Sequence, residues 1–380
     1  MIEDFDDQIP DLEIPDIELE DYVIPEEEET AVADESGGSQ VIAWIGSGQG
    51  GGRIAEAFYD RGYKKCIVVN TSNHDLGSLH IPSKHKMLFD CGEHGAGKDM
   101  AKGQDAANKY KQDVFDRMRQ IYGDNVDHVF VCVGAGGGSG SGSASVLVEV
   151  AKKYMKYVGY DNADERVGVI LSLPTRGEAG SPIVAANAYE VLSTMGKAAK
   201  SKQISPLIII DNSKIEKMYR GLTVKQFWPL VNSTISGLFH VFNVLTSNPS
   251  PYTSFDPTDY SSVLRCGGVM VMGVAKLKEF DDEQVVSRAI KSNIGRTLLT
   301  DVELSDAKVA ACVAIGSKDI MENTPGLMDS LSYGFDTLSS LCPQATLHRG
   351  IYEDNKDSLR LYTLISGLNI PENRLKQLKG

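Results

Sequence analysis

Short apolar runs alternate with longer, more polar segments between residues 41 and 210. The runs at 41–45, 66–69, 129–133, 167–173 and 207–210 are almost entirely apolar. Such runs are typical of strands buried on both faces, and the segments between them are long enough for helices. Because parallel strands need long crossover connections, the alternation predicts an α/β fold around a parallel sheet.

A longer apolar segment follows at 227–246 and ends at residues 248–251 (NPSP), which interrupt a helix. A shorter series of alternating strands and helices comes after this break. The pattern predicts a second, smaller mixed α/β domain, coupled to the first through a long central helix. The predicted divisions are a tail at 1–39, a first domain at 40–226, the central helix at 227–248, a second domain at 249–370 and a carboxyl-terminal tail at 371–380.

The strand predicted at 129–133 runs directly into a loop at 134–143 that contains six glycines, and a helix is predicted to follow. Backbone N–H groups converge where a helix begins, the helix dipole adds positive potential, and glycine lets a ligand approach the backbone closely. We therefore expect an anion site. A flexible linker, the alternative, is rarely flanked by a buried strand and a helix. The loop is not a P-loop, because no Lys-Ser or Lys-Thr pair follows its glycines.

Two further glycine turns follow apolar runs, one beginning at Gly46 and one at 91–98. Gly46, Gly48 and Gly51 satisfy the G-x-G-x-x-G fingerprint, which makes a Rossmann NAD-dependent oxidoreductase an alternative. The next strand, however, ends at Asn70, where that fingerprint has an acidic residue for the ribose. Three glycine turns at the carboxyl edge of one sheet fit a polyphosphate better than a single pyrophosphate.

The net charge of −14 is concentrated at the amino terminus. Residues 1–37 hold 16 Asp and Glu and no Lys or Arg, which leaves 36 acidic and 38 basic residues elsewhere. With these charges and three Ile-Pro pairs, the segment 1–39 is predicted to be disordered. It is either a linear motif for a partner protein or a solubilising tail. The nearly neutral remainder has no dense basic patch, so direct nucleic-acid binding is not expected.

The cellular compartment is indicated by the cysteines and the hydropathy pattern. Six dispersed cysteines without a C-x-x-C pair are typical of reduced thiols in an intracellular protein, not of a zinc site or a disulfide framework. The chain lacks a run of ~18 apolar residues that would predict a membrane span. Its acidic amino terminus does not resemble a secretory signal. We therefore expect a cytoplasmic protein.

Residues 136–142 (GGGSGSG) are similar to the signature G-G-G-T-G-[ST]-G of the tubulin and FtsZ superfamily of GTPases. Ser139 replaces the usual threonine and keeps its hydroxyl. The resemblance covers about residues 40–370 and is strongest to the TubZ filament proteins of plasmids and phages. It implies the tubulin/FtsZ-like fold, binding of GTP and GDP, and hydrolysis of GTP. It also implies Mg²⁺ held mainly by the GTP phosphates, with no protein ligand assigned.

Specific residues match the motifs of this superfamily, and the resemblance assigns them roles in nucleotide binding. One departure occurs at Pro182, where FtsZ carries an arginine, and Arg176 is the candidate replacement. Trp228 is expected to stack on guanine, with a core-packing indole as the alternative. Pro229 suits a first helical position, which would place Trp228 at the helix cap. The assigned residues are Gly48, Gln49 and Gly50 in the first phosphate loop, Asn70 and Thr71 after the second strand, Gly95, Ala96 and Gly97 at the γ-phosphate, Gly136, Gly137, Gly138, Ser139 and Gly140 in the signature loop, Glu178 at the ribose, and Asn212, Trp228 and Asn232 at guanine.

Residues 254–259 (SFDPTD) resemble the N-x-D-x-x-D loop of the superfamily, with Ser254 in place of asparagine. In the superfamily this loop completes the catalytic site of the next subunit. The resemblance therefore identifies Asp256 and Asp259 as catalytic acids that polarise the attacking water. Phosphoryl transfer suits carboxylates, because it needs an oriented water and a neutralised phosphate. Without the resemblance, two aspartates beside a proline would be read as turn formers.

Together these features predict a GTPase that assembles head to tail into a cytoskeletal filament, for segregation or positioning of plasmid or phage DNA. Its partners would be other copies of itself and an adaptor protein that binds the acidic tail. The alternatives are a cell-division ring protein of the FtsZ type, a nucleotide-binding family member without hydrolysis, and the NAD-dependent oxidoreductase.

Overall fold

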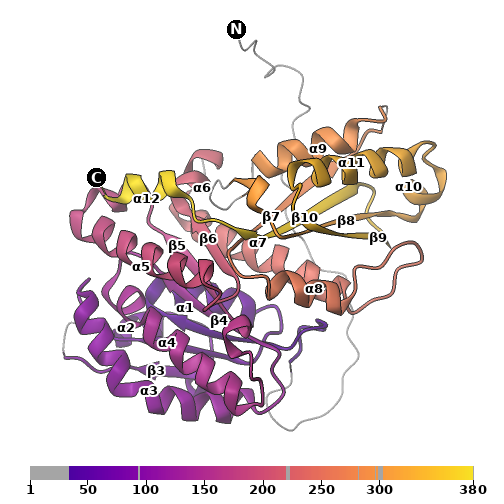
Figure 1. The fold of residues 1–380 in the computed structure, drawn as a ribbon. Coiled ribbons are helices and arrows are strands. Elements are labelled where there is room, and N and C mark those ends of the chain that lie inside the picture. The colour runs from indigo at the N-terminus through magenta and orange to yellow at the C-terminus, as the bar shows by residue number, and fades with distance from the viewer. Residues whose placement is uncertain are drawn as a thin grey trace.

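The computed structural model describes residues 34–92, 95–219, 223–280, 282–295, 297 and 303–379. Its strands form one ten-stranded sheet in the order β3-β2-β1-β4-β5-β6-β7-β10-β8-β9 (Figure 1). The predicted α/β fold with a largely parallel sheet is confirmed.

Six parallel strands make up the first half of the sheet, and five of them coincide with the predicted apolar runs. Almost every residue of these five strands is buried. This burial explains the unbroken apolar runs, since helices cover both faces of a parallel sheet. The strands are β1 (Ile42–Ser47), β2 (Cys66–Asn70), β3 (Lys86–Leu88), β4 (His128–Gly134), β5 (Val167–Leu173) and β6 (Leu207–Asp211).

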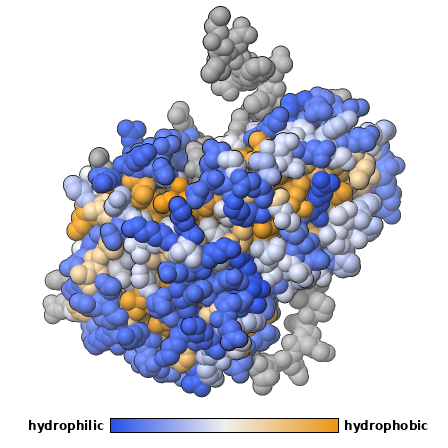
Figure 2. Space-filling view, in the orientation of Figure 1, coloured by the Kyte–Doolittle hydropathy of each residue, from blue (hydrophilic) through white to orange (hydrophobic). Residues whose placement is uncertain are grey.

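Helices α3, α4 and α5 lie together on one face of these strands, and α1 packs against the central helix α7 on the other (Figure 1). Polar side chains cover most of α3 and α4 on the face shown in Figure 2, whereas apolar ones gather along the junction with the second half of the chain. The helices of the first half are α1 (Gly48–Tyr59), α2 (Asn73–Gly77), α3 (Met100–Tyr122), α4 (Gly138–Tyr157), α5 (Pro182–Lys200) and α6 (Asn212–Met218), with short 3₁₀ turns η1 (Ser83–His85), η2 (Ala163–Arg166) and η3 (Glu178–Gly180).

The central helix α7 spans Val224–Leu245 and begins earlier than the apolar segment suggests. Thr223 and Gln226 form a capping box that starts it. Pro229 therefore lies inside the helix, and the expectation that it occupies the first helical position is wrong. The buried side chains of α7 recur at helical spacing, and Phe239 packs edge-on against Trp44 of β1. This contact fixes the helix across the first half of the sheet.

The second half of the chain continues the same sheet. Two residue pairs, Leu207 with Val269 and Ile208 with Met270, join β6 to β7 in parallel. Strand β10 then lies antiparallel between β7 and β8. The sheet is thus continuous across the junction, and the division into two domains stays a prediction. The elements are α8 (Pro257–Leu264), β7 (Val269–Leu277), α9 (Val285–Gly295), η4 (Leu304–Asp306), β8 (Val309–Ser317), α10 (Lys318–Asn323), α11 (Leu327–Leu341), β9 (Thr346–Asp354), β10 (Leu359–Leu368) and α12 (Glu372–Lys379).

Most of the predicted amino-terminal tail, residues 1–33, lies outside the described residues. Residues 34–39 are described, and they pack on the body of the chain. The Ser39 N–H donates to the Asn243 carbonyl at 3.0 Å, and the Gln40 N–H donates to Asn243 Oδ1 at 2.9 Å. Gly38 packs so closely that a Cβ there would lie 2.0 Å from Asn243 Nδ2. The folded part of the chain therefore begins before residue 40.

Within the described part of the chain, no helix has the length and apolar character needed to cross a bilayer.

Candidate nucleotide-binding site

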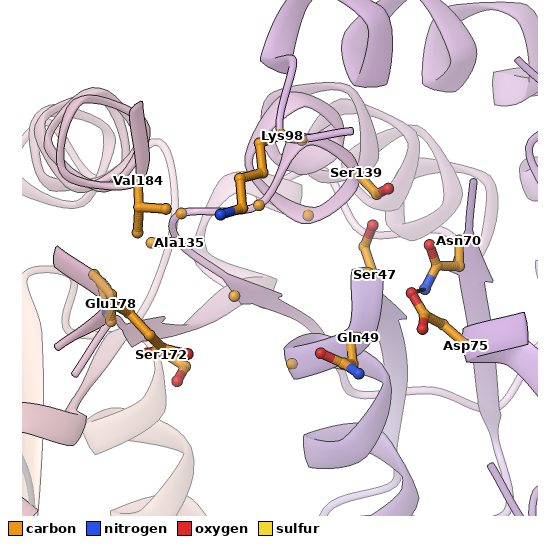
Figure 3. A pocket seen from close by; sticks show the side chains of 18 of the residues that line it. Ser47, Gln49, Asn70, Asp75, Lys98, Ala135, Ser139, Ser172, Glu178 and Val184 are labelled. Atoms are coloured by element: carbon orange, nitrogen blue, oxygen red, sulfur yellow. Dashed lines mark hydrogen bonds between the residues drawn. The ribbon is translucent and has the colours of Figure 1, made fainter. Parts of the chain in front are cut away.

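A cavity of about 670 Å³ lies at the carboxyl ends of the strands in the first half of the sheet (Figure 3). All seventeen residues predicted to bind a nucleotide line it, although they come from loops spread over 185 positions of the chain. Their individual contacts with a ligand stay predictions. The lining residues predicted from the sequence are Gly48, Gln49, Gly50, Asn70, Thr71, Gly95, Ala96, Gly97, Gly136, Gly137, Gly138, Ser139, Gly140, Glu178, Asn212, Trp228 and Asn232.

The signature loop connects β4 to α4 and presents bare backbone to this cavity. Gly137 caps α4 without a side-chain hydrogen bond, so the first N–H groups of the helix have no capping side chain. A Cβ on Gly137 would meet nothing within 4 Å, which leaves room for a ligand against the backbone. Behind the loop, Gly136 is held by Ser141 Oγ at 3.0 Å and by Asn187 Nδ2 at 3.2 Å. The loop is therefore fixed from behind and open in front, as an anion cradle requires.

A second helix start, that of α1, faces the same cavity. Gly48 begins the helix with φ +69, and a Cβ there would come within 2.9 Å of the Gly140 backbone nitrogen. Only glycine allows the two loops to approach this closely. Ser47 and Ser143 hydroxyls lie 2.6 Å apart and join β1 to α4 beneath the loops. Two helix dipoles thus raise the potential at one end of the cavity.

Thr71 connects three loops of the site. Its hydroxyl oxygen accepts from the Ala96 N–H at 3.0 Å and is hydrogen-bonded to the Ser139 hydroxyl. Gly95 has φ +59, and a Cβ there would lie 3.0 Å from the Thr71 carbonyl. Beside them, the Asn70 side chain accepts from the Ser72 N–H at 3.1 Å. Asn70 and Thr71, which match the Asn-Thr pair of the superfamily, therefore organise the phosphate end of the cavity.

The opposite end of the cavity is lined by Asn212, Trp228 and Asn232. Asn212 is 3% exposed, and its Nδ2 donates to Ser172 Oγ at 3.0 Å. Its Oδ1 is buried without a hydrogen-bond partner among the described residues. A buried acceptor without a partner is costly, so this oxygen marks the position of a ligand donor. Trp228 is half-buried and lies outside the hydrophobic core, which does not fit the alternative of a core-packing indole.

Glu178 lines the cavity beside Ser172, on the turn η3 (Figure 3). Its Oε2 accepts from the Thr175 N–H at 2.8 Å and from the Thr175 hydroxyl at 3.0 Å. These bonds orient the carboxylate. Neither Arg176 nor Pro182 lines the cavity, so the suggestion that Arg176 replaces the FtsZ arginine is not supported by its placement.

Several lining residues were not found from the sequence. Lys98 follows the glycine turn at 95–97 with φ +69, and its side chain extends into the cavity (Figure 3). Arg53 and Asp75 also line the cavity, and Asp75 Oδ2 lies 3.4 Å from Asn70 Nδ2. The sequence signal for Lys98 was a single cation at the end of a glycine turn. No signal distinguished Arg53 or Asp75 from ordinary surface charges.

A buried ion pair supports the strands behind this site. Arg374 of α12 lies 3.2 Å from Asp211 Oδ2, and both side chains are nearly buried. The guanidinium also donates to the Pro174 carbonyl at 3.1 Å and to Ser213 Oγ at 3.0 Å. Burial raises the pKa of Asp211, and Arg374 opposes this shift. Helix α12 is thereby tied to the ends of β5 and β6, the strands that precede Glu178 and Asn212.

The two predicted catalytic aspartates do not line the cavity. Asp256 caps α8, where its Oδ1 accepts from the Asp259 N–H at 2.8 Å and its own N–H donates to Asp259 Oδ2 at 3.3 Å. Asp256 is exposed, and the Asp259 side chain is 27% exposed. His348 of β9, which sequence reasoning missed, lies beside them with Nδ1 2.8 Å from Asp259 Oδ1. The carboxylates thus belong to a separate, surface-facing cluster.

Residues 41–220 match the model of the Tubulin/FtsZ family, GTPase domain. The chain is 22% identical over 368 residues to the tubulin-like protein TubZ of Bacillus cereus, covering 87% of this chain and 80% of that protein. It is 25% identical over 343 residues to the cell division protein FtsZ 2 of Methanocaldococcus jannaschii, covering 89% and 82%. A GTPγS-form protofilament of TubZ from Bacillus thuringiensis serovar israelensis superposes with a TM-score of 0.77 at 20% identity, covering 92% and 91%. The resemblance to tubulin, FtsZ and TubZ proteins is confirmed.

Proposed function

We propose, taking as premise that residues 41–220 form a Tubulin/FtsZ-type GTPase domain, that this chain binds and hydrolyses GTP and assembles head to tail into filaments. The observation that carries the proposal is the convergence of seventeen residues on one cavity. One end of this cavity offers unpaired helix N–H groups, and the other offers the buried, unpartnered Asn212 Oδ1. A nucleoside polyphosphate has the complementary chemistry at its two ends.

The phosphates would lie at the starts of α1 and α4, with Lys98 and Arg53 supplying positive charge. The amide nitrogen of Asn212 already donates a hydrogen bond to Ser172 Oγ, so the amide presents its oxygen to the ligand. An acceptor at this position suits the N1–H and amino group of guanine, whereas adenine N1 carries no hydrogen. This arrangement supports GTP or GDP over the adenine nucleotides. Trp228 would stack on the base and Asn232 would approach its edge.

The residues present also fit a magnesium ion. Asp75 is a carboxylate at the phosphate end of the cavity, where it would repel a polyphosphate unless a cation lay between them. Hard oxygen ligands of this kind suit Mg²⁺, which takes one or two carboxylates and keeps phosphate and water oxygens as its other ligands. When bound, the ion would neutralise charge on the phosphates. Asp75 is the residue of this chain that would hold it, directly or through water.

Hydrolysis would require a second subunit. Asp256 and Asp259 lie outside the cavity of their own chain, but an exposed and a partly exposed carboxylate can reach the cavity of a neighbour. There they would orient the attacking water and accept its proton. A head-to-tail contact of this kind repeats without closing and so builds a filament. The protofilament form of the TubZ relative supports this proposal.

Among biological roles, we favour segregation or positioning of plasmid or phage DNA through an adaptor on the acidic tail, inside the cytoplasm. The TubZ relatives support this choice, and the FtsZ relative keeps a cell-division ring as the second candidate. The NAD-dependent oxidoreductase is disfavoured, because Asn70 stands in place of the expected acid and turns its side chain to Ser72 and Asp75.

Phosphate release from GTP, measured against protein concentration, tests the proposal. A shared active site predicts turnover per subunit that rises steeply above a threshold concentration and then levels off. Turnover that is independent of concentration would contradict assembly-dependent hydrolysis. Absence of turnover together with tight NAD binding would favour the oxidoreductase, and GTP binding without turnover would favour a purely structural role.

A further inference from the structure

The carboxylate of Asp259 is held from two sides by residues of its own chain. Asp256 donates its N–H to Oδ2 at 3.3 Å, a long hydrogen bond. His348 Nδ1 lies 2.8 Å from Oδ1, a distance typical of a charge-assisted bond. Asp259 belongs to α8 and His348 to β9, so the shorter contact joins two different elements.

The His348 ring is itself fixed in place. Its Nε2 lies 3.2 Å from Ser262 Oγ, on the same side of α8 as Asp259. The side chain is 17% exposed, and its ring centroid lies 6.1 Å from that of the buried Phe255. A ring with a partner at each nitrogen cannot rotate without breaking both contacts. His348 therefore presents Nδ1 to Asp259 in one orientation.

The whole segment 253–259 packs on β9, the strand at one edge of the sheet. The Ile351 N–H donates to the Thr253 carbonyl at 2.8 Å. The Tyr352 hydroxyl accepts from the Phe255 N–H at 2.9 Å and donates to the Phe255 carbonyl at 3.0 Å. Among the contacts from β9, the one made by His348 is the contact to a predicted catalytic carboxylate, that of Asp259. Strand β9 thus acts as the support on which the carboxylates are mounted.

We propose that His348 is a positioning residue that holds Asp259 in the orientation from which it acts on the nucleotide of the next subunit. This inference rests on the proposed function, because orienting Asp259 affects catalysis only if Asp259 acts in the nucleotide site of the neighbouring subunit. Without His348, Asp259 keeps only the long bond from Asp256, and its carboxylate is free to leave the productive rotamer. A displacement of a catalytic group by about 1 Å costs catalysis on the order of a hundredfold.

Two substitutions of His348 distinguish the role of its Nδ1 contact from that of its Nε2 contact. In His348→Asn the amide nitrogen can take the place of Nδ1 and still donate to Asp259. In His348→Gln the longer side chain places its amide near Nε2 and leaves Asp259 without the donor. We expect His348→Gln to lower GTP turnover per assembled subunit roughly tenfold or more, and His348→Asn to restore most of it. Both variants should bind GTP as monomers and sediment as polymer with GTPγS as the wild type does.

Ser262→Ala and Asp259→Asn complete the experiment. Ser262→Ala removes the contact at Nε2 but leaves the Asp259 contact intact, so turnover should stay within about threefold of wild type. Asp259→Asn reports on the proposed function itself. If Asp259→Asn turns over GTP normally, the shared site is wrong and the role of His348 falls with it. If Asp259→Asn is inactive while His348→Gln retains full turnover, the shared site stands and the positioning role alone is overturned.

Discussion

The Thr71 hydroxyl oxygen accepts a hydrogen bond from the Ala96 N–H at 3.0 Å, which ties the loop after β2 to the turn before α3. The same hydroxyl is bonded to Ser139 in the signature loop. Thr71→Val keeps the shape of the side chain and removes both bonds. Loss of a buried hydrogen bond costs about 1 kcal/mol, and misplaced loops weaken phosphate contacts further. We expect a Kd for GTP raised about tenfold, measured by titration of the monomer.

Ser139→Thr is the matched control for Thr71→Val. It retains the hydroxyl that bonds Thr71 and restores the residue found in the superfamily signature. Its affinity for GTP should equal that of the wild type. An unchanged Kd in Thr71→Val would show that the three loops hold their positions independently.

Asn212 is predicted to set the choice of base. Asn212→Ala removes the buried acceptor, and sites built on such hydrogen bonds lose about 1.5–3 kcal/mol when the bond is missing. Affinity for GTP should fall by about 10 to 100-fold, while the weak affinity for ATP should hardly change. In Ser172→Ala the amide loses the partner that fixes its orientation, so selectivity for GTP over ATP should narrow. Competition binding with both nucleotides measures these ratios; equal losses for GTP and ATP would contradict base reading by Asn212.

Asp259→Ala is expected to bind GTP and to polymerise but to hydrolyse GTP very slowly, because Asp259 does not line the nucleotide cavity of its own chain. Loss of a positioned general base costs about 10² to 10⁴-fold in rate. Phosphate release and sedimentation, measured on the same sample, separate assembly from hydrolysis. Normal turnover in this variant would refute the shared-site mechanism.

Because the pKa of the partly buried His240 is lowered, we expect the free energy of unfolding to fall in mild acid. Burial, and the nearby Arg61 to a smaller extent, lower the pKa of His240 from 6.5 to about 4. Below pH 6.5 the unfolded chain binds a proton at this ring and the folded chain does not, so the free energy of unfolding falls as pH drops toward 4. The loss between pH 7 and pH 5 should be about 1–2 kcal/mol, followed by denaturant titration. His240→Gln removes the titrating group, and its stability should depend less steeply on pH.

The amino-terminal segment can be divided at residue 34. Deleting 1–33 removes most of the acidic charge of the tail but none of the contacts to Asn243, so the melting temperature and the affinity for GTP should not change. Recruitment of the proposed adaptor should be lost if the segment is a linear motif, and kept if it is a solubilising tail. Deleting 1–39 also removes the Ser39 bond to Asn243 and the packing of Gly38, which should lower the free energy of unfolding by about 1–3 kcal/mol. Loss of GTP affinity on deleting 1–33 would contradict a separate role for this segment.

Much of this architecture follows from the sequence because burial on both faces leaves unmistakable apolar runs, as in β4 and β5. The resemblance then located the cavity lining, since Gly95, Gly97 and Gly136 have positive φ angles that favour glycine whatever ligand is bound. The roles of Lys98, Asp75 and His348 are not predictable from the sequence, because a single polar residue belongs to no periodic pattern and to no motif of fixed spacing. The predicted start of α7 lies later than the observed one, because Pro229 suits a first helical position, whereas the capping box of Thr223 and Gln226 starts the helix one turn earlier.

Strand β10 is the last strand in chain order, yet it lies inside the sheet, between β7 and β8. During synthesis β7 and β8 emerge long before their shared neighbour, and each waits with an unpaired edge. Such edges are templates for aggregation. Translation that stops before residue 359 would release a chain in which the first six strands can pair, but in which β7 and β8 each keep an unpaired edge that can associate with other chains. The second half of the sheet therefore closes only after β10 (Leu359–Leu368) has been synthesised and has inserted between β7 and β8.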